Sequence, residues 1–227
     1  MDLIQSSDSS LLVRFGDTVD PVQHRQVLAL FRALASRREP GIVNLHPAYA
    51  SLLIEFDPLR LDVQQVSALV SGVDMGAASG DPPGITHEIP VCYDAELGPD
   101  LADVSDLTGL ATEEIVKLHT GPEYPIYFLG FSPGFAYLGG LSPALAVPRL
   151  ASPRKLVPAG SVAIGGEQTG IYPTNSPGGW RIIGRTPVRL FKPSDASRPT
   201  LFQPGDRVRF RSISRSRFEE ISRDHRA

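Results

Sequence analysis

The sequence predicts an α+β protein in two parts, and three observations support this prediction. Residues 1–95 alternate short apolar strings with two amphipathic helical stretches. Residues 121–205 hold 13 glycines and 13 prolines, and short apolar strings such as 126–129 and 161–164 lie between them. Short strands separated by frequent turns are typical of a β-barrel or sandwich. Apolar residues make up 41% of the chain, which is enough to bury a core.

In the first part, residues 11–15 are expected to form a strand that ends at Gly16. A helix follows from Asp20, with an acid and a proline at its start and Arg37-Arg38 at its end. Residues 42–45 and 51–56 predict a hairpin around Pro47, and residues 62–70 a second helix stopped by Gly72. Residues 87–93 predict a further strand. This order, β-α-β-β-α-β, is that of the ferredoxin-like split arrangement.

The Gly/Pro-rich segment 76–84 suggests a domain boundary. We expect an N-terminal ferredoxin-like domain over 1–84, whose last strand is either within it or is 87–93. A β-barrel domain over 85–214 and a charged, solvated C-terminal tail over 215–227 complete the prediction. Two short helices are expected between residues 100 and 120, with Thr112 as the cap of the second.

Composition excludes several classes of function. Lys+Arg 22 against Asp+Glu 25 gives a net charge of −3, so no overall basic excess attracts nucleic acid or a membrane. Cys92 is the only cysteine, and the five histidines are scattered without metal-ligand spacing, so we expect no metal site. No apolar run is long enough for a bilayer, and the start lacks the features of a signal peptide. A cytoplasmic protein is expected.

Residues 130–134, Gly-Phe-Ser-Pro-Gly, match the letters of a serine hydrolase elbow. That device uses the backbone N–H of the residue after the serine, and here this residue is Pro133, which has none. We therefore predict a tight turn after a buried strand and no nucleophile at Ser132. The chain also lacks a P-loop, so any nucleotide is bound in another way.

Positive charge is concentrated in one stretch. Residues 124–194 carry seven basic residues and one acid, Glu167, for a charge of +6, whereas the rest of the chain carries −9. Such segregation favours an anionic small molecule or an acidic partner surface. Outward-facing arginines on alternating strand positions explain it equally well.

Residues 165–180 are the densest group of glycine, proline and polar side chains. Glycines allow close backbone approach to a ligand, and polar side chains such as those of Gln168, Thr169 and Tyr172 suit a small polar substrate. Trp180, the only tryptophan, is either a pocket wall or core. His119, just before a Gly-Pro break, is either a proton carrier or a complement to the end of its helix.

The motifs of the second part resemble one known family. They include the run 119–138 with His-Thr and Gly-Phe-Ser-Pro-Gly-Phe-Ala-Tyr-Leu, the segment 157–164 with Val-Pro-Ala-Gly-Ser-Val-Ala-Ile, Gln-Thr-Gly-Ile-Tyr-Pro at 168–173 and Ser-Pro-Gly-Gly-Trp at 176–180. The set is similar to the KipI / allophanate hydrolase subunit 1 family, whose bacterial members are B subunits of ATP-dependent 5-oxoprolinases.

The resemblance implies a ferredoxin-like N-terminal domain followed by a cyclophilin-like β-barrel. It also implies two partners, one of the KipA (allophanate hydrolase subunit 2) type and one of the LamB/YcsF type, which are the C and A subunits of such enzymes. Together they open the lactam of 5-oxo-L-proline to L-glutamate with ATP as co-substrate, and we expect this chain to be inactive without its partners. ATP is bound either by these partners or by an unfamiliar site.

Carried onto this sequence, the resemblance implies two groups of site residues. His119 and Gln168 are the expected catalytic residues, His119 as a proton carrier and Gln168 orienting the amide. The expected substrate-binding residues, with Arg154 as a carboxylate or phosphate clamp, are Gly134, Arg154, Thr169, Tyr172, Gly178, Gly179 and Trp180. Two other functions remain open within the family: a KipI-like inhibitor of the autophosphorylation of a sensor histidine kinase, and a urea or allophanate hydrolase component.

Overall fold

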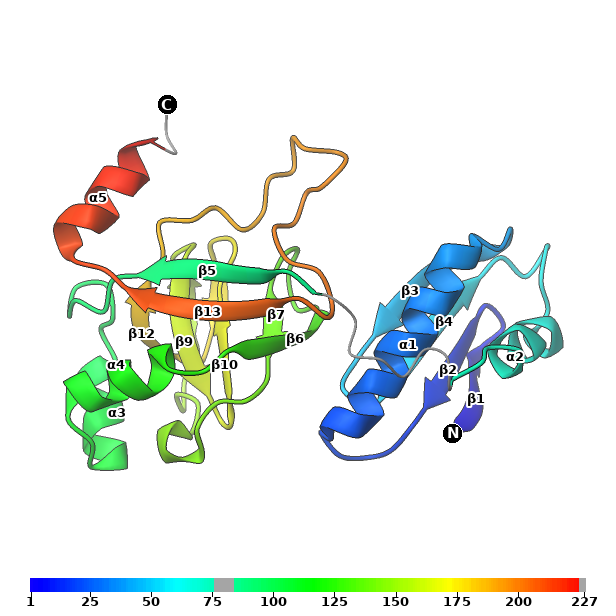
Figure 1. The fold of residues 1–227 in the computed structure, drawn as a ribbon, viewed down its shortest axis with the longest axis horizontal. Coiled ribbons are helices and arrows are strands. Elements are labelled where there is room, and N and C mark those ends of the chain that lie inside the picture. The colour runs from blue at the N-terminus through cyan, green and yellow to red at the C-terminus, as the bar shows by residue number, and fades with distance from the viewer. Residues whose placement is uncertain (76–83, 225–227) are drawn as a thin grey trace. The chain divides into compact units, whose positions relative to one another are not determined.

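The computed structural model describes residues 1–75 and 84–224 (Figure 1). The predicted linker 76–84 lies, apart from Gly84, outside these residues. The chain divides into two compact units, Met1–Pro83 and Gly84–Ala227, each with its own hydrophobic core. Helices and strands occur in both units, so the protein is of the mixed α/β kind that the sequence predicted.

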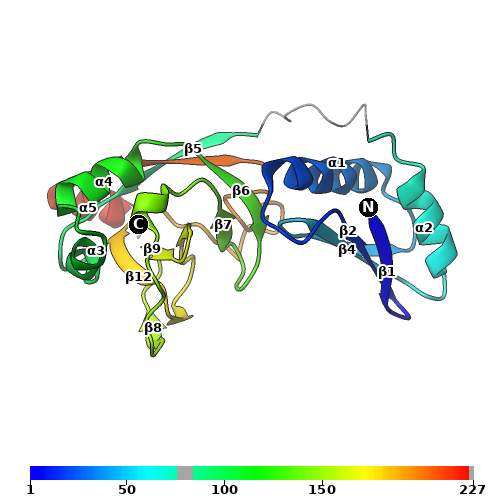
Figure 2. The same ribbon diagram turned by 90° about the horizontal axis from the view of Figure 1, so that it is seen from below.

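The first unit is a four-stranded antiparallel sheet with two helices. Its strands lie in the order β1 (Asp2–Ser7), β2 (Ser10–Arg14), β4 (Ser51–Phe56) and β3 (Ile42–Pro47). Alternate residues of β2 and β4 face the helices α1 (Pro21–Arg37) and α2 (Val63–Ser71), and α1 runs along the sheet in Figure 2. The core of this unit is formed chiefly by Leu11, Val13, Val27, Leu30, Leu34, Leu52, Ile54, Phe56, Val66 and Val70.

Both helices of the first unit begin where the sequence signals place them. The Asp20 carboxylate accepts hydrogen bonds from the backbone N–H groups of Val22 and Gln23, and Pro21 is the first residue of α1. At α2, Asp62 and Gln65 form a reciprocal capping box. The predicted hairpin over 42–56 is also confirmed, as strands β3 and β4.

The prediction of a β-α-β-β-α-β unit is wrong in two respects. Strand β1 was missed, because all six of its residues are exposed and carry no strand-like alternation of burial. The strand predicted over 87–93 is β5 (Thr86–Val91), and it lies in the sheet of the second unit, parallel to β13 (Arg207–Ser212). The first unit therefore has the order β-β-α-β-β-α, with β1 at the sheet edge beside β2.

The second unit is built on a seven-stranded, barrel-like sheet. Its order is β12 (Arg181–Arg185), β9 (Ser161–Gly165), β10 (Gln168–Ile171), β7 (Ala136–Leu138), β6 (Tyr124–Leu129), β13 and β5. The two outer strands approach each other where Cys92 and Arg185 exchange two backbone hydrogen bonds of 2.9 Å. This bridge nearly closes the sheet. Strands β8 (Arg154–Val157) and β11 (Ser176–Gly178) form a separate two-stranded ribbon.

The predicted helices between residues 100 and 120 are present as α3 (Leu101–Thr108) and α4 (Thr112–Thr120), and the short η1 (Pro143–Leu145) follows later in the chain. Thr112 is not the cap of α4. Ala111 occupies that position without a side-chain bond, because Thr112 already begins the helix.

The described part of the charged tail forms a helix, α5 (Arg215–Asp224), which the sequence analysis did not predict. Two ion pairs at helical spacing support it, Arg215 with Glu219 and Arg217 with Glu220. Its charged side chains are largely solvated, as expected from the composition.

Candidate functional site

Five aromatic rings surround a small pocket in the second unit, here called the aromatic pocket. Its volume is about 180 Å³, and its other lining residues are Arg149, Leu150, Pro153, Gly178 and Gly179. The rings meet edge to face, the arrangement that aromatic pairs prefer, with centroid separations of 5.2 to 6.5 Å. They belong to Phe131, Phe135, Tyr137, Tyr172 and Trp180.

The strands explain why these rings meet. Phe135 precedes β7 and Tyr137 lies within it, two residues apart and therefore on the same side of the chain. Tyr172 follows β10, and Trp180 precedes β12. Phe135, Tyr172 and Trp180 also belong to a buried cluster, so the pocket floor is part of the core.

Two glycines make room for these rings. A Cβ atom at Gly165 would lie 2.6 Å from the Trp180 ring, closer than any real side chain comes. At Gly178 a Cβ would collide with the Tyr172 hydroxyl. Glycine at both positions is therefore required by the aromatic packing.

Phe131 stands at the mouth of the pocket in a strained conformation. Its φ is +66°, in the left-handed region that costs a bulky residue about 1–2 kcal/mol. Its side chain remains 63% exposed although it touches the rings of Phe135 and Tyr172. Residues held in sparsely populated backbone conformations cluster at functional sites.

The turn that carries Phe131 is the one predicted instead of a hydrolase elbow. The N–H of Gly130 bonds to the carbonyl of Phe135 at 3.1 Å, and that of Phe135 to the carbonyl of Ser132 at 3.0 Å. Strand β7 follows the turn, not the helix that a nucleophile elbow opens. The Ser132 hydroxyl is buried without a hydrogen-bond partner in the described chain, so no base activates it.

Arg149 supplies the positive charge of the aromatic pocket. Its guanidinium carbon lies 5.7 Å from the centre of the Trp180 ring, within cation–π range. Arg149 forms no ion pair with any residue in the described ranges. Burial raises the pKa of the nearby Tyr172 hydroxyl, while a backbone hydrogen bond from Trp180 and the charge of Arg149 act in the opposite direction. The pocket thus offers apolar walls, a neutral phenol and an available cation.

Arg154, the predicted clamp, is engaged elsewhere. Its two terminal nitrogens donate to both carboxylate oxygens of Asp100, at 2.9 and 2.6 Å. Asp100 is only 3% exposed and also accepts the backbone N–H of Ile182 at 2.7 Å. This bidentate pair ties β8 to the start of α3 and to β12, so the geometry gives Arg154 a structural contact.

His119 lies in the core with no exposed surface. Its ring stacks on Phe210 at 4.4 Å and bonds to the Tyr93 hydroxyl through Nδ1, at 2.7 Å, and to Thr169 Oγ1 through Nε2, at 2.8 Å. Because Thr169 donates its proton to the carbonyl of Ala163, it accepts from the Nε2–H of His119, and Tyr93 donates to Nδ1. Burial lowers the pKa of His119 to about 3, so the ring is neutral near pH 7.

The remaining predicted residues lie apart from the aromatic pocket. Gln168 is half-buried at the start of β10, and Thr169 is buried beside His119. Gly134, with a φ of +84°, packs in its turn against Leu190 and Phe191. Of the nine residues, the structure brings four to the pocket lining: Tyr172, Gly178, Gly179 and Trp180.

The sequence did not single out the other lining residues as a site. Phe131, Phe135 and Tyr137 were noted only as part of a family motif, and Arg149 only within the basic stretch and the family motifs. The alternation of Phe135 and Tyr137 was a signal that both rings share one face. Their meeting with Trp180, 43 positions later than Tyr137, depends on strand pairing and was not visible.

Within residues 1–75 and 84–224, no three His, Cys, Asp or Glu side chains are grouped to hold a metal ion. In the same ranges, no helix has both the length and the apolar character needed to cross a membrane.

Comparison with known proteins defines the class of the chain. Residues 1–202 match the family described as carboxyltransferase domain, subdomain C and D. The chain is 38% identical to the 5-oxoprolinase B subunit of Bacillus subtilis, with 92% of each protein covered. It is 40% identical to the 5-oxoprolinase B subunit of Haemophilus influenzae, over 92% of this chain and 97% of that protein. The chain therefore belongs to the carboxyltransferase-domain family that includes the 5-oxoprolinase B subunits.

The chain is also similar to solved structures. The crystal structure of TTHA0988 is similar with a TM-score of 0.82 and 41% identity, over 90% of this chain. The present chain corresponds to 40% of that longer protein. The urea carboxylase of Kluyveromyces lactis is similar in fold, with a TM-score of 0.77 over 98% of this chain and 22% of that one, at 19% identity. That likeness shows the fold alone.

Proposed function

We propose that this chain is the B subunit of an ATP-dependent 5-oxoprolinase, which opens the lactam of 5-oxo-L-proline to L-glutamate. The observation that carries the proposal is its identity of 38% to 40% with proteins of that name over nearly their whole length. The aromatic pocket supports it chemically. A small, flat lactam fits between rings, and its carboxylate fits the guanidinium of Arg149.

The chemistry of the lactam explains the need for ATP. An amide is a poor electrophile, and transfer of the γ-phosphoryl group of ATP to its oxygen makes the ring carbon more electrophilic. Water then adds to that carbon, and the carbon–nitrogen bond of the ring breaks to release the amine. A second water hydrolyses the resulting acyl phosphate to the carboxylate and phosphate. The aromatic pocket holds no unengaged histidine or carboxylate to act as a base: its described lining residues are aromatic, aliphatic, glycine and arginine. We therefore propose that the companion proteins, of the KipA and LamB/YcsF types, supply the missing groups and that the chain alone is inactive.

The fold proposal follows the same resemblance. We propose that the nearly closed sheet of the second unit is a variant of the cyclophilin-like barrel. The first unit is a ferredoxin-like relative in which β1 takes the edge position expected for the strand 87–93. The chain divides into two compact units between Pro83 and Gly84, which supports treating each unit as a domain.

The test is reconstitution with the two proposed companions. 5-Oxoproline, ATP and all three proteins together are expected to release glutamate and ADP, and omission of this chain is expected to abolish release. No turnover by the complete set would contradict the function. Full turnover by this chain alone would contradict the sharing of the site.

An inhibitor of a sensor kinase is the second candidate, and one observation favours it. Phe131 (63% exposed) and Leu156 (61% exposed) are large apolar side chains on the second unit that a docking partner could cover. In that case the purified chain is expected to slow autophosphorylation of a sensor histidine kinase without any companion protein. An unchanged rate eliminates this candidate.

A further inference from the structure

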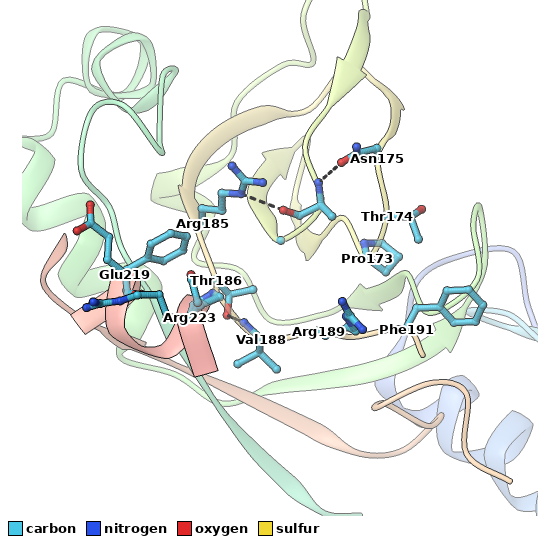
Figure 3. A pocket seen from close by; sticks show the side chains of 15 residues that line it. Pro173, Thr174, Asn175, Arg185, Thr186, Val188, Arg189, Phe191, Glu219 and Arg223 are labelled. Carbon is cyan, nitrogen blue, oxygen red and sulfur yellow. Dashed lines mark hydrogen bonds between the residues drawn. The ribbon is translucent and has the colours of Figure 1, made fainter. Parts of the chain in front are cut away.

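A second, larger cavity of the second unit shares no lining residue with the aromatic pocket and has a different chemistry. Its volume is about 1000 Å³, against about 180 Å³ for the aromatic pocket. We call it the cationic pocket, because three arginines from three segments line it: Arg185 at the end of β12, Arg189 in the following loop and Arg223 in α5. In Figure 3 the three arginines come from separate segments of the lining, with Arg223 beside Glu219 on α5 and Arg189 between Val188 and Phe191.

Two of these cations are not neutralised by the pocket lining. Arg189 is exposed and forms no ion pair with a described residue, and Arg223 bonds to the backbone carbonyl of Glu219, at 3.3 Å. Arg185 is held in place by a 2.9 Å bond from its Nε to the carbonyl of Ala159. Glu219 is the one acid among the described lining residues, and its carboxylate accepts a 2.8 Å bond from Arg215.

The rest of the lining combines polar side chains with apolar and aromatic ones. Phe218 and Arg223 lie on the face of α5 that borders the cavity, and Phe191 lies in the loop after Arg189. Asn175 bonds through its side-chain oxygen to the N–H of Ala159, which leaves its amide N–H₂ as a donor. Guanidinium groups bind phosphates in a bidentate manner, and aromatic rings stack on planar bases.

We infer that the cationic pocket binds a nucleoside triphosphate, with its phosphates at Arg185, Arg189 and Arg223 and its base against one of the two phenylalanine rings of the lining. The volume of the cavity suits a nucleotide better than the lactam, because the lactam would leave most of the space empty. The inference deepens the proposed function, on which it rests for the choice of ATP. It places the co-substrate in this chain rather than in a companion.

Binding of ATP to the purified full-length chain tests the inference by calorimetry. ATP and inorganic tripolyphosphate are expected to bind, and adenosine much more weakly. Arg189→Ala is expected to raise the dissociation constant of ATP about tenfold, the worth of one charge-assisted contact. The dissociation constant of Arg189→Lys for ATP should fall between those of wild type and Arg189→Ala. The double variant Arg189→Ala, Arg223→Ala should bind ATP more weakly than Arg189→Ala alone. Arg25→Ala, which removes an exposed arginine from α1 of the first unit, is the matched control and should leave binding unchanged.

Several outcomes would overturn the inference. These are an absence of ATP binding at concentrations up to about 1 mM, or equal affinity in Arg189→Ala and wild type. Another is weaker association of a companion protein with Arg189→Ala at unchanged ATP affinity, which would identify an acidic protein segment as the occupant.

The reconstituted complex separates this inference from the proposed function. If the complex turns over 5-oxoproline and Arg189→Ala leaves the KM for ATP unchanged, the proposed function is supported and the proposed nucleotide site is contradicted. If the complex binds ATP in an arginine-dependent manner but does not turn over 5-oxoproline, the nucleotide site is supported and the proposed function is contradicted.

Discussion

Arg154 and Asp100 meet through two parallel hydrogen bonds, and this pair lies across three elements that are distant in the sequence. Asp100 is 3% exposed, whereas the side chain of Arg154 is 32% exposed. A carboxylate left alone in such a place loses its hydration without compensation. The basic stretch noted in the sequence is therefore partly structural, and only some of its members are available to ligands.

The first prediction concerns this pair. Asp100→Ala is expected to lower the free energy of unfolding by about 3 kcal/mol, because both Arg154 and the N–H of Ile182 lose their acceptor. Urea denaturation measures it. Asp103→Ala, which removes the 58% exposed partner of Arg181, is the control and should cost less than about 1 kcal/mol. Similar costs for the two variants would show that the Arg154–Asp100 pair does not stabilise the fold.

The second prediction concerns the buried histidine. The folded pKa of His119, about 3, lies below its ordinary value of 6.5, so between these values only the unfolded chain takes up a proton. Stability is thus complete above pH 6.5 and falls as the pH drops toward 3. Between pH 6.5 and about 4.5, the free energy of unfolding of His119→Gln is expected to fall by less than that of wild type, with a difference on the order of 2 kcal/mol.

Unfolding followed at several pH values measures the difference. His24, in the first unit, has a pKa lowered by burial to about 4 and contributes in the same direction. A variant at His119 with an unchanged slope would contradict the buried, neutral state of the ring.

The third prediction concerns recognition of the substrate carboxylate. In the reconstituted enzyme, Arg149→Ala is expected to raise the KM for 5-oxoproline about tenfold, with little change in kcat, because it removes a contact present before reaction. Arg149→Lys should retain part of the affinity but lose the stacking on Trp180. Lys155→Ala removes an exposed cation outside the pocket lining and should have no effect. Equal KM values for Arg149→Ala and Lys155→Ala would exclude this role.

Local signals predicted the helices well. Asp20-Pro21 and Asp62 mark the helix starts, and each carboxylate caps its helix through hydrogen bonds to backbone N–H groups within three residues. Sheet membership could not be predicted in this way. The strand 86–91 has the same pattern in either sheet, and its pairing with residues 207–212 is a contact across more than a hundred positions. Strand β1 and helix α5 are largely exposed, so burial left no periodicity from which to infer them.

The site was predictable in part for a related reason. Tyr172, Gly178, Gly179 and Trp180 lie in one dense motif, and their glycines mark a close approach. The sequence alone did not distinguish an arginine bound to a buried acid, such as Arg154, from one facing a pocket, such as Arg149. That distinction depends on where Asp100 lies in the fold.

The last prediction concerns the strained aromatic residue at the pocket mouth. Phe131→Gly relieves the positive φ of +66° and, since the side chain is 63% exposed, forfeits little packing. It is expected to leave stability unchanged or raise it by up to about 1 kcal/mol, whereas Phe131→Ala keeps the strain and gains nothing. Both variants are expected to weaken 5-oxoproline binding, because each opens the pocket to water. Thermal denaturation and substrate titration measure the two effects separately. If both variants bind substrate as wild type does, the strain at Phe131 serves the turn alone, and the mouth of the pocket lies elsewhere.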